Sequence, residues 1–332
     1  MRTRVTLIPG DGIGPEVTAA TTAVLEAAGA PLEWETVQAG AAAVDAVGVP
    51  VPDAVFASLR KNRVGLKGPL STPKGRGWRS ANVTIRQELE LYVGLRPVKS
   101  LPGIVTPYSG VDLVVLRENT EDLYAGIEHE IKPGTVISLK VSTRAAGERI
   151  AKWAFEFMRY QGRRRITCCH KTPVSPLADG AFLDSFEAIG HDYPFIRQDD
   201  RLIDNLAMDL AKDPNPYDVL LLQNLYGDIL SDLCAGLVGG LGVVPGANIG
   251  DRIAVFEAVH GTAPDIAGQG KANPLAVLMS GVMMLEYIGE HRVAERVNRA
   301  IWNVLEEGRH LTGDLGGPEG TAGFTAALID KL

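Results

Sequence analysis

The sequence of 332 residues predicts an α/β fold built on a parallel sheet, and three observations support this. Val219–Leu222 is an uninterrupted apolar run, which is typical of a strand buried on both faces. Similar runs at Val111–Leu116 and Arg165–Cys169 alternate along the chain with stretches of helical pattern. Each of the three runs ends in polar residues, as expected where ligands bind beyond the carboxyl ends of parallel strands.

The composition is that of a globular protein, with 45% hydrophobic and 22% charged residues. A net charge of -7 and a pI near 5.5 argue against nucleic acid or an anionic membrane as the main partner. The longest apolar segment, Leu275–Leu285, is too short to span a bilayer, and the N-terminus lacks the apolar region of a signal peptide. Cys168, Cys169 and Cys234 fit no zinc spacing, so we expect buried free thiols and a cytoplasmic protein.

The chain opens with a predicted strand, Arg4–Ile8, and a helix, Pro15–Ala28, with proline at its opening position. Gly10–Glu16 lies between them and superficially matches the dinucleotide fingerprint GxGxxG. That fingerprint requires glycine where Pro15 stands. We therefore interpret the segment as a tight glycine turn and not as a Rossmann motif.

The next polar segment, Ser71–Gly77, has few packing groups and is expected to be a mobile loop after an extended stretch, Val64–Pro69. A helix is predicted over Ser80–Leu89, with Ser80 at its N-terminus. That end, with Arg86 further along the helix, could receive a carboxylate or phosphate, although a serine there is usually only a cap. Further helices are predicted over Ala146–Tyr160, Asp179–Glu187, Leu202–Lys212 and Leu275–Tyr287.

Two aspartates follow the buried strand Val219–Leu222. Asn224–Gly227 breaks the apolar run, and the next helix is predicted to start at Asp228. Asp228 and Asp232 are four residues apart and would share one helix face, which suits a divalent cation such as Mg²⁺ or Mn²⁺. The alternative is that both aspartates only favour the positive end of the helix.

Five motifs are spread along nearly the whole chain. They are GDGIGPE at Gly10–Glu16, RENTEDLYAGIE at Arg117–Glu128, NLYGDILSD at Asn224–Asp232, VHGTAPDIAGQGKANP at Val259–Pro274 and DLGG at Asp314–Gly317. Together they resemble one family, the β-decarboxylating dehydrogenases of 2-hydroxy acids. The resemblance implies a non-Rossmann fold with a large α/β domain from both chain ends (1–98 and 252–332). It also implies a smaller middle domain (99–251) that carries the dimer contact, and a homodimer, or a higher oligomer, whose active sites borrow residues from the neighbouring subunit.

Within this resemblance, the substrate is identified by Ser80, Asn82 and Arg86, which match the isocitrate enzymes. A hydroxyl and an amide suit isocitrate's third carboxylate, which an alkyl group could not replace. Arg96 and Arg117 match two further substrate arginines of the family. Homoisocitrate, tartrate and isopropylmalate are the alternative substrates, and a non-catalytic regulatory subunit is an alternative of another class.

The resemblance also implies the cofactor. The segment starting at His260 is similar to the family's adenosine-binding loop, and Asp265-Ile266 stands where NADP-using relatives carry Lys-Tyr. A carboxylate accepts hydrogen bonds from a ribose hydroxyl but repels a 2′-phosphate, so we expect NAD. The expected contacts are His260, Gly261, Thr262, Ala263, Asp265, Ile266 and Asn273, with Ile13, Thr72 and Glu257 as further candidates.

For the chemistry, the resemblance implies a metal held by Asp204, Asp228 and Asp232, with Asp204 and Asp232 from different subunits. Lys171, Asp204 or a water between them would take the hydroxyl proton, and Tyr124 would protonate the carbon left by CO₂. Pro173 departs from the pattern, because family members commonly have asparagine there. The departure affects the expected placement of the nicotinamide.

Overall fold

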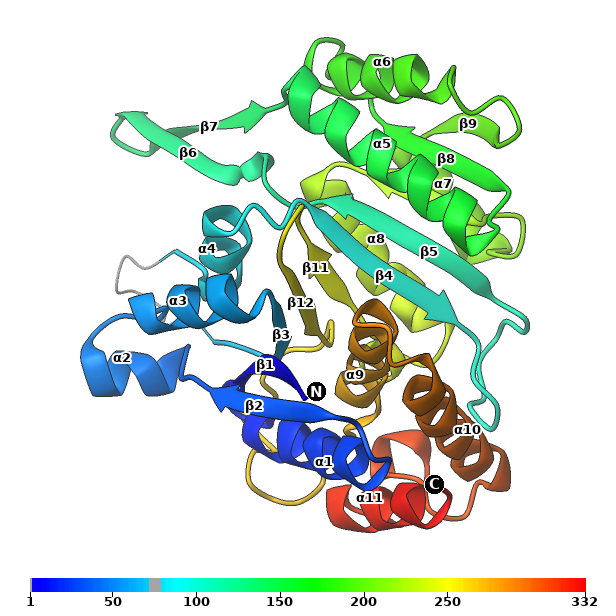
Figure 1. Ribbon diagram of the computed structural model, residues 1–332. Coiled ribbons are helices and arrows are strands. Elements are labelled where there is room, and N and C mark those ends of the chain that lie inside the picture. Colours follow the sequence, from blue (N-terminus) through cyan, green and yellow to red (C-terminus); the bar gives the residue numbers. More distant parts are fainter. Residues whose placement is uncertain (1, 72–78) are drawn as a thin grey trace.

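The computed structural model describes residues 2–71 and 79–332, and within these ranges the frame is one ten-stranded sheet (Figure 1). Thr72 and the rest of the predicted loop after Ser71 lie outside the described residues. The strand order is β2-β1-β3-β12-β11-β4-β5-β10-β8-β9. The expectation of a parallel sheet holds on both sides but is wrong at the centre, where β12, β11, β4 and β5 pair antiparallel. The four residues between β11 and β12 allow a hairpin but no parallel crossover.

One parallel block of the sheet is made from both ends of the chain. Strand β12 pairs with β3, so a strand from late in the chain completes the N-terminal group. Helix α1 packs against α9 and α11, and Figure 1 shows both chain ends in this half. Glu16 of α1 accepts hydrogen bonds from the N–H groups of Gly270 (3.2 Å) and Ala272 (2.9 Å). The elements are β1 (Thr3–Ile8), α1 (Gly14–Ala27), β2 (Leu32–Thr36), α2 (Ala41–Val47), α3 (Asp53–Asn62), β3 (Val64–Lys67), α4 (Ala81–Glu88), β12 (Ala254–Glu257), α9 (Leu275–Tyr287), α10 (His291–Glu307) and α11 (Thr321–Asp330).

The other parallel block comes from the middle of the chain, and β4 and β11 join it to the first. All four residues of β10 are fully buried, which confirms the interpretation of the apolar run. The predicted helices are present and, apart from α8, differ from expectation by at most three residues at an end. The elements are β4 (Val93–Lys99), β5 (Asp112–Glu118), α5 (Arg144–Gln161), β8 (Arg165–His170), α6 (Ala178–Gly190), β9 (Arg197–Leu202), α7 (Ile203–Lys212), β10 (Val219–Leu222), α8 (Asn224–Leu237) and β11 (Ala247–Ile249).

Helix α8 starts one turn earlier than predicted, at Asn224 and not at Asp228. We expected Gly227 to break the chain, but it lies inside the first turn and its N–H donates to Gln223 O (2.8 Å). A Cβ at Gly227 would lie 2.6 Å from the Arg117 side chain. The glycine is there because Arg117 passes close to the helix, and not because the chain turns.

A two-stranded arm was not foreseen. Strands β6 (Asp122–Lys132) and β7 (Thr135–Val141) form a separate antiparallel ribbon that projects from the body (Figure 1). Apolar and polar residues alternate in Ile137–Val141, a strand signal that the sequence analysis missed, and many apolar side chains of the arm are exposed. The exposed ones are Leu123, Ile127, Ile131, Val136, Ile137 and Leu139.

The most apolar segment, within α9, is buried in the core of the first block. Among the described residues, no helix is both long and apolar enough to cross a membrane. Cys168, Cys169 and Cys234 are buried free thiols, as predicted.

Candidate active site

Three predicted polar strand ends meet at one edge of the sheet. Strands β5, β10 and β8 are parallel neighbours, and Leu222 pairs with both Arg117 and Cys169. Arg117, Gln223 and His170 therefore lie at the same end of adjacent strands. This arrangement confirms the prediction drawn from the three apolar runs.

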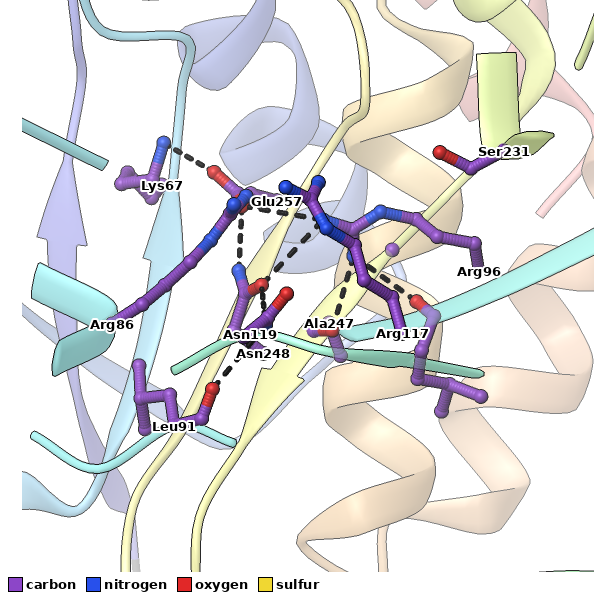
Figure 2. A network of polar contacts seen from close by, with 12 residues as sticks. Lys67, Arg86, Leu91, Arg96, Arg117, Asn119, Ser231, Ala247, Asn248 and Glu257 are labelled. Atoms are coloured by element: carbon purple, nitrogen blue, oxygen red, sulfur yellow. Dashed lines mark hydrogen bonds and ion pairs between the residues drawn. The ribbon is translucent and has the colours of Figure 1, made fainter. Parts of the chain in front are cut away.

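A cationic cavity lies beside this edge. Arg86 from α4, Arg96 from β4 and Arg117 from β5 all line one cavity of about 150 Å³ (Figure 2). Three guanidinium groups from separate elements thus face a common space, as the substrate prediction required. Asn82, Asp228 and Asp232 line the same cavity.

Glu257 at the end of β12 links the cations on one side of this cavity. Its carboxylate lies 2.5 Å from Lys67 Nζ, 2.9 Å from Arg86 Nη2 and 3.5 Å from Arg96 Nη2 (Figure 2). It also accepts a 2.5 Å hydrogen bond from the Asn248 side chain. Burial alone would raise the pKa of Glu257, but the three cations outweigh it and hold the pKa well below its usual value.

Burial affects the cations in the opposite direction. It lowers the pKa of Lys67 and lowers that of Arg96 to about 10. The sequence analysis missed Lys67, although a lysine that ends a short apolar strand was a signal that it is buried. Glu257 was expected to contact the cofactor. That stays a prediction, and both carboxylate oxygens are already engaged by protein groups.

Unsatisfied polar atoms gather at the cavity. Asn82 Oδ1, Arg86 Nε and His260 Nε2 are buried, and none has a hydrogen-bond partner among the described residues. All three residues line the cavity. Because buried polar atoms without partners are costly, this arrangement indicates a polar ligand. Ser80 is at the N-cap of α4 but exposed, and it is not among the lining residues.

Arg117 is fixed by groups of the same site. Its Nε and Nη2 donate to Asn224 Oδ1 at 2.9 and 2.7 Å, and its Nη1 donates to Asp228. The guanidinium carbon lies 4.9 Å from the centre of the Tyr124 ring, and Tyr124 Oη donates to Asp228. Burial and then the Asp228 hydrogen bond raise the pKa of Tyr124, so the phenol stays protonated at neutral pH.

Asp228 and Asp232 lie on consecutive turns of α8, as predicted. Burial and then the Asp228 charge raise the pKa of Asp232, whose carboxylate has no hydrogen bond or ion pair among the described residues. A divalent cation would relieve this repulsion, and two carboxylates are its preferred ligands, so the pair fits a metal. Lys171 and Asp204 instead pair with each other at 2.6 Å. Within the described residues of one chain, no three His, Cys, Asp or Glu side chains gather to hold a metal, so Asp204 does not join the other two.

A second cavity of about 540 Å³ adjoins the first at His260, which lines both. Of the expected cofactor contacts, Ile13, His260, Ile266 and Asn273 line it. Gly261 instead lines the cationic cavity.

The glycine turn before α1 contacts the loop that is expected to bind adenosine. Ile13 N–H donates to Thr262 O (2.9 Å), and a Cβ at Gly12 would lie 2.0 Å from that oxygen. Ala263 and Asp265 lie in the same loop, with Asp265 exposed, and neither lines the cavity. The cavity and the unpaired His260 nitrogen fit a nucleotide cofactor.

The family model for isocitrate/isopropylmalate dehydrogenase matches residues 4–332. The chain belongs to the isocitrate/isopropylmalate dehydrogenase family. It is 49% identical over 329 residues to a probable mitochondrial NAD isocitrate dehydrogenase subunit alpha of Caenorhabditis elegans, covering 99% of this chain and 92% of the relative. A crystal structure of isocitrate dehydrogenase from Methylococcus capsulatus has a TM-score of 0.97 at 49% identity, with 100% of this chain and 99% of that chain covered. This family member therefore has the isocitrate/isopropylmalate dehydrogenase fold, as predicted.

Two other relatives of this family member have names that differ in the cofactor or in the role of the subunit. An NADP isocitrate dehydrogenase of Thermus thermophilus is 48% identical, over 100% of this chain and 68% of the relative. An NAD isocitrate dehydrogenase regulatory subunit of Dictyostelium discoideum is 47% identical, over 99% and 92%. Family membership alone thus leaves the cofactor and the catalytic role to be argued from the site.

Proposed function

We propose that this dehydrogenase converts isocitrate and NAD⁺ to 2-oxoglutarate, CO₂ and NADH with Mg²⁺ or Mn²⁺. The observation that carries the proposal is the convergence of Arg86, Arg96 and Arg117 on one cavity with the unpaired Asn82 Oδ1. Three guanidinium groups match a tricarboxylate. The unpaired Asn82 oxygen would accept from a hydroxyl, while the amide nitrogen of the same side chain donates to a carboxylate.

The alternative substrates are homoisocitrate, tartrate and isopropylmalate. An alkyl group against Asn82 would leave the amide unpaired, which disfavours isopropylmalate. Tartrate has two carboxylates and would leave one arginine without its anion. Homoisocitrate has three carboxylates, so each of the three arginines would keep an anionic partner. It is therefore the alternative substrate that fits the cavity best.

The protein's own residues divide the chemical work. When bound, the divalent cation polarises the substrate's hydroxyl and stabilises negative charge on its oxygen. Arg86, Arg96 and Arg117 orient the carboxylates. The protonated Tyr124, whose hydroxyl donates to Asp228, is the candidate to give a proton to the carbon that CO₂ leaves. Lys171, paired with Asp204, is the candidate to accept the hydroxyl proton.

For the cofactor, the proposal of NAD rests on Asp265, an exposed carboxylate in the loop that borders the second cavity. It would repel a 2′-phosphate and accept from a free ribose hydroxyl. Because a relative from Thermus thermophilus is named as an NADP isocitrate dehydrogenase, this assignment should be tested directly by kinetics with both cofactors.

We propose two domains, 1–98 with 252–332 and 99–251, because the two parallel blocks of the sheet draw on these same segments.

The exposed apolar arm β6–β7 supports a homodimer. Neither Lys171 nor Asp204 lines the cationic cavity of the same chain, which supports a partner's contribution to each site. The chain has all the candidate catalytic and metal-binding residues, namely Tyr124, Lys171, Asp204, Asp228 and Asp232, which argues against a regulatory subunit.

A cytoplasmic location stays a prediction, and several relatives have names that place them in mitochondria.

The deciding experiment is initial-rate kinetics of the purified protein with Mg²⁺ or Mn²⁺. Isocitrate, homoisocitrate, isopropylmalate and tartrate are each tested against NAD and NADP. We expect the highest kcat/KM for isocitrate with NAD. A higher value for another acid would overturn the substrate assignment, and no turnover of any of the four would favour the regulatory subunit.

A further inference from the structure

The base of the arm contains an ion pair between the half-buried Lys140 and the buried Asp179 that the proposed chemistry does not use. Lys140, near the end of β7, places Nζ 2.5 Å from Asp179 Oδ1 and 2.7 Å from Gln223 Oε1. The same ammonium lies 4.7 Å from the centre of the Tyr226 ring and 3.8 Å from Asp122. Lys140 therefore ties the arm to the start of α6 and to the start of α8.

Asp179 connects Lys140 to Lys171, the candidate catalytic lysine. The Asp179 side chain is fully buried, and its Oδ2 accepts a 2.6 Å hydrogen bond from the backbone N–H of Lys171. It accepts a second, of 3.2 Å, from Tyr226 Oη. Burial and then the Asp179 charge raise the pKa of Tyr226, which keeps this hydroxyl a donor.

The rest of the Lys171 backbone is also held. Its carbonyl accepts hydrogen bonds from the N–H groups of Val174 (2.9 Å) and Ser175 (3.0 Å). The next residue, Thr172, donates its N–H to Nδ1 of the buried His170 (3.2 Å). Pro173 has no N–H to donate. Of these anchors, only the bond to Asp179 connects Lys171 to a charged group of another element.

We propose that Lys140 is a positioning residue: through Asp179 it holds the backbone of Lys171 so that the lysine side chain meets Asp204 and the substrate. The inference rests on the role of Lys171 in the proposed function. If Lys140 is lost, Asp179 keeps a buried charge without its cation, and the contact to Lys171 N–H must shift or admit water. A catalytic amine displaced by about 1 Å loses rate without weakening the arginines that bind substrate.

The test compares Lys140→Met, Lys140→Arg and the control Lys99→Met. Lys99 is also paired with an aspartate, Asp112 at 3.5 Å, but both side chains are exposed. We expect Lys140→Met to lower kcat for isocitrate about tenfold or more while KM changes by less than about twofold. We expect Lys140→Arg to restore most of the rate and Lys99→Met to behave as the parent protein.

A readout independent of turnover is hydrogen exchange at the amide of Lys171. Exchange should accelerate in Lys140→Met and stay unchanged in Lys140→Arg and Lys99→Met. If Lys140→Met does not fold, Asp179→Asn carries the test, because the amide keeps the side-chain size and removes the charge. Folding of each variant is checked by its melting temperature and elution volume.

The outcomes separate the two proposals. A parent-like kcat and parent-like exchange in folded Lys140→Met would overturn the positioning role. A lower kcat that Lys140→Arg does not restore, with parent-like exchange, would also overturn it. If the parent protein turns over none of the four acids, the proposed function fails. Faster hydrogen exchange of the Lys171 amide in Lys140→Met would even then establish that Lys140 holds the Lys171 backbone through Asp179.

Discussion

Lys67 Nζ lies 2.5 Å from Glu257 Oε2, with only 3% and 5% of the two side chains exposed. Since Arg86 and Arg96 share the same carboxylate, Glu257 compensates only one of three positive charges. The remaining positive charge faces the cavity and suits an anionic substrate. Glu257 therefore stabilises Lys67, Arg86 and Arg96 in the folded protein before the substrate binds.

The first prediction concerns stability. Glu257→Gln leaves Lys67 buried without a counter-charge, and the removal of one partner of a buried pair typically costs about 3–5 kcal/mol. We expect the free energy of unfolding in urea to fall by about 3 kcal/mol. The control is Glu33→Gln, which breaks an exposed pair with Arg4 and should cost less than about 1 kcal/mol. Equal losses in the two variants would contradict the role of Glu257.

The second prediction concerns pH. The pKa of Glu257 in the folded protein is well below its ordinary value of 4.5. Its contribution is therefore complete above pH 4.5 and declines as the pH falls towards the folded pKa, because the unfolded chain takes up the proton first. The stability gap between the parent and Glu257→Gln should stay constant from neutral pH to near 5 and narrow below it. A stability difference between the parent and Glu257→Gln that increases as the pH falls would contradict the predicted direction of the Glu257 pKa shift.

The third prediction concerns substrate choice. Asn82→Leu removes the amide at the cavity and adds apolar surface, so kcat/KM for isocitrate should fall about 100-fold or more. The ratio of isopropylmalate to isocitrate turnover should rise. Asn298→Leu, an exposed change on α10, is the control and should leave both rates as they are. A parent-like preference in Asn82→Leu would remove Asn82 from the substrate site.

The fourth prediction concerns the cofactor. Asp265→Lys with Ile266→Tyr replaces the carboxylate with a cation able to pair with a 2′-phosphate. We expect the ratio of kcat/KM for NADP to that for NAD to rise at least about tenfold. Asp330→Lys, at the exposed end of α11, controls for the change in net charge. An unchanged ratio would mean that residue 265 does not face the ribose.

The fifth prediction concerns the metal. Asp228→Asn and Asp232→Asn should each weaken Mn²⁺ binding, measured by calorimetry with substrate present, by about 100-fold. Turnover should be lost in both variants. The melting temperature should stay near that of the parent in Asp232→Asn and fall in Asp228→Asn, because the buried Arg117 loses its carboxylate partner. Asp184→Asn, on the exposed side of α6, should bind Mn²⁺ normally. Undiminished binding in Asp228→Asn would exclude it as a ligand.

The strand ends could be predicted from the sequence because buried parallel strands are apolar and end in polar residues. Gly227 could not be interpreted correctly, since its reason is a close approach by Arg117, more than a hundred residues earlier. The Lys67–Glu257 pair also joins distant residues, and no local pattern reports such a contact. The exposed arm β6–β7 carries the usual period-two signal at Ile137–Val141, but the sequence analysis did not use it. Local signals thus predicted most of the elements and the matched motifs supplied candidate site residues, whereas long-range contacts required the structure.

The insertion of β12 beside β3 has a consequence for synthesis on the ribosome. Residues 3–67 emerge early, but β3 lacks its second neighbour, β12, until residues 254–257 have emerged, and α1 waits longer still for α9 and α11. The middle of the chain, which holds β5, β10, β8 and β9, has all of its strands available sooner. The usual order, in which the N-terminal unit folds first, is therefore reversed here. During translation the N-terminal strands present an open sheet edge, which is the part of the nascent chain most exposed to wrong pairing.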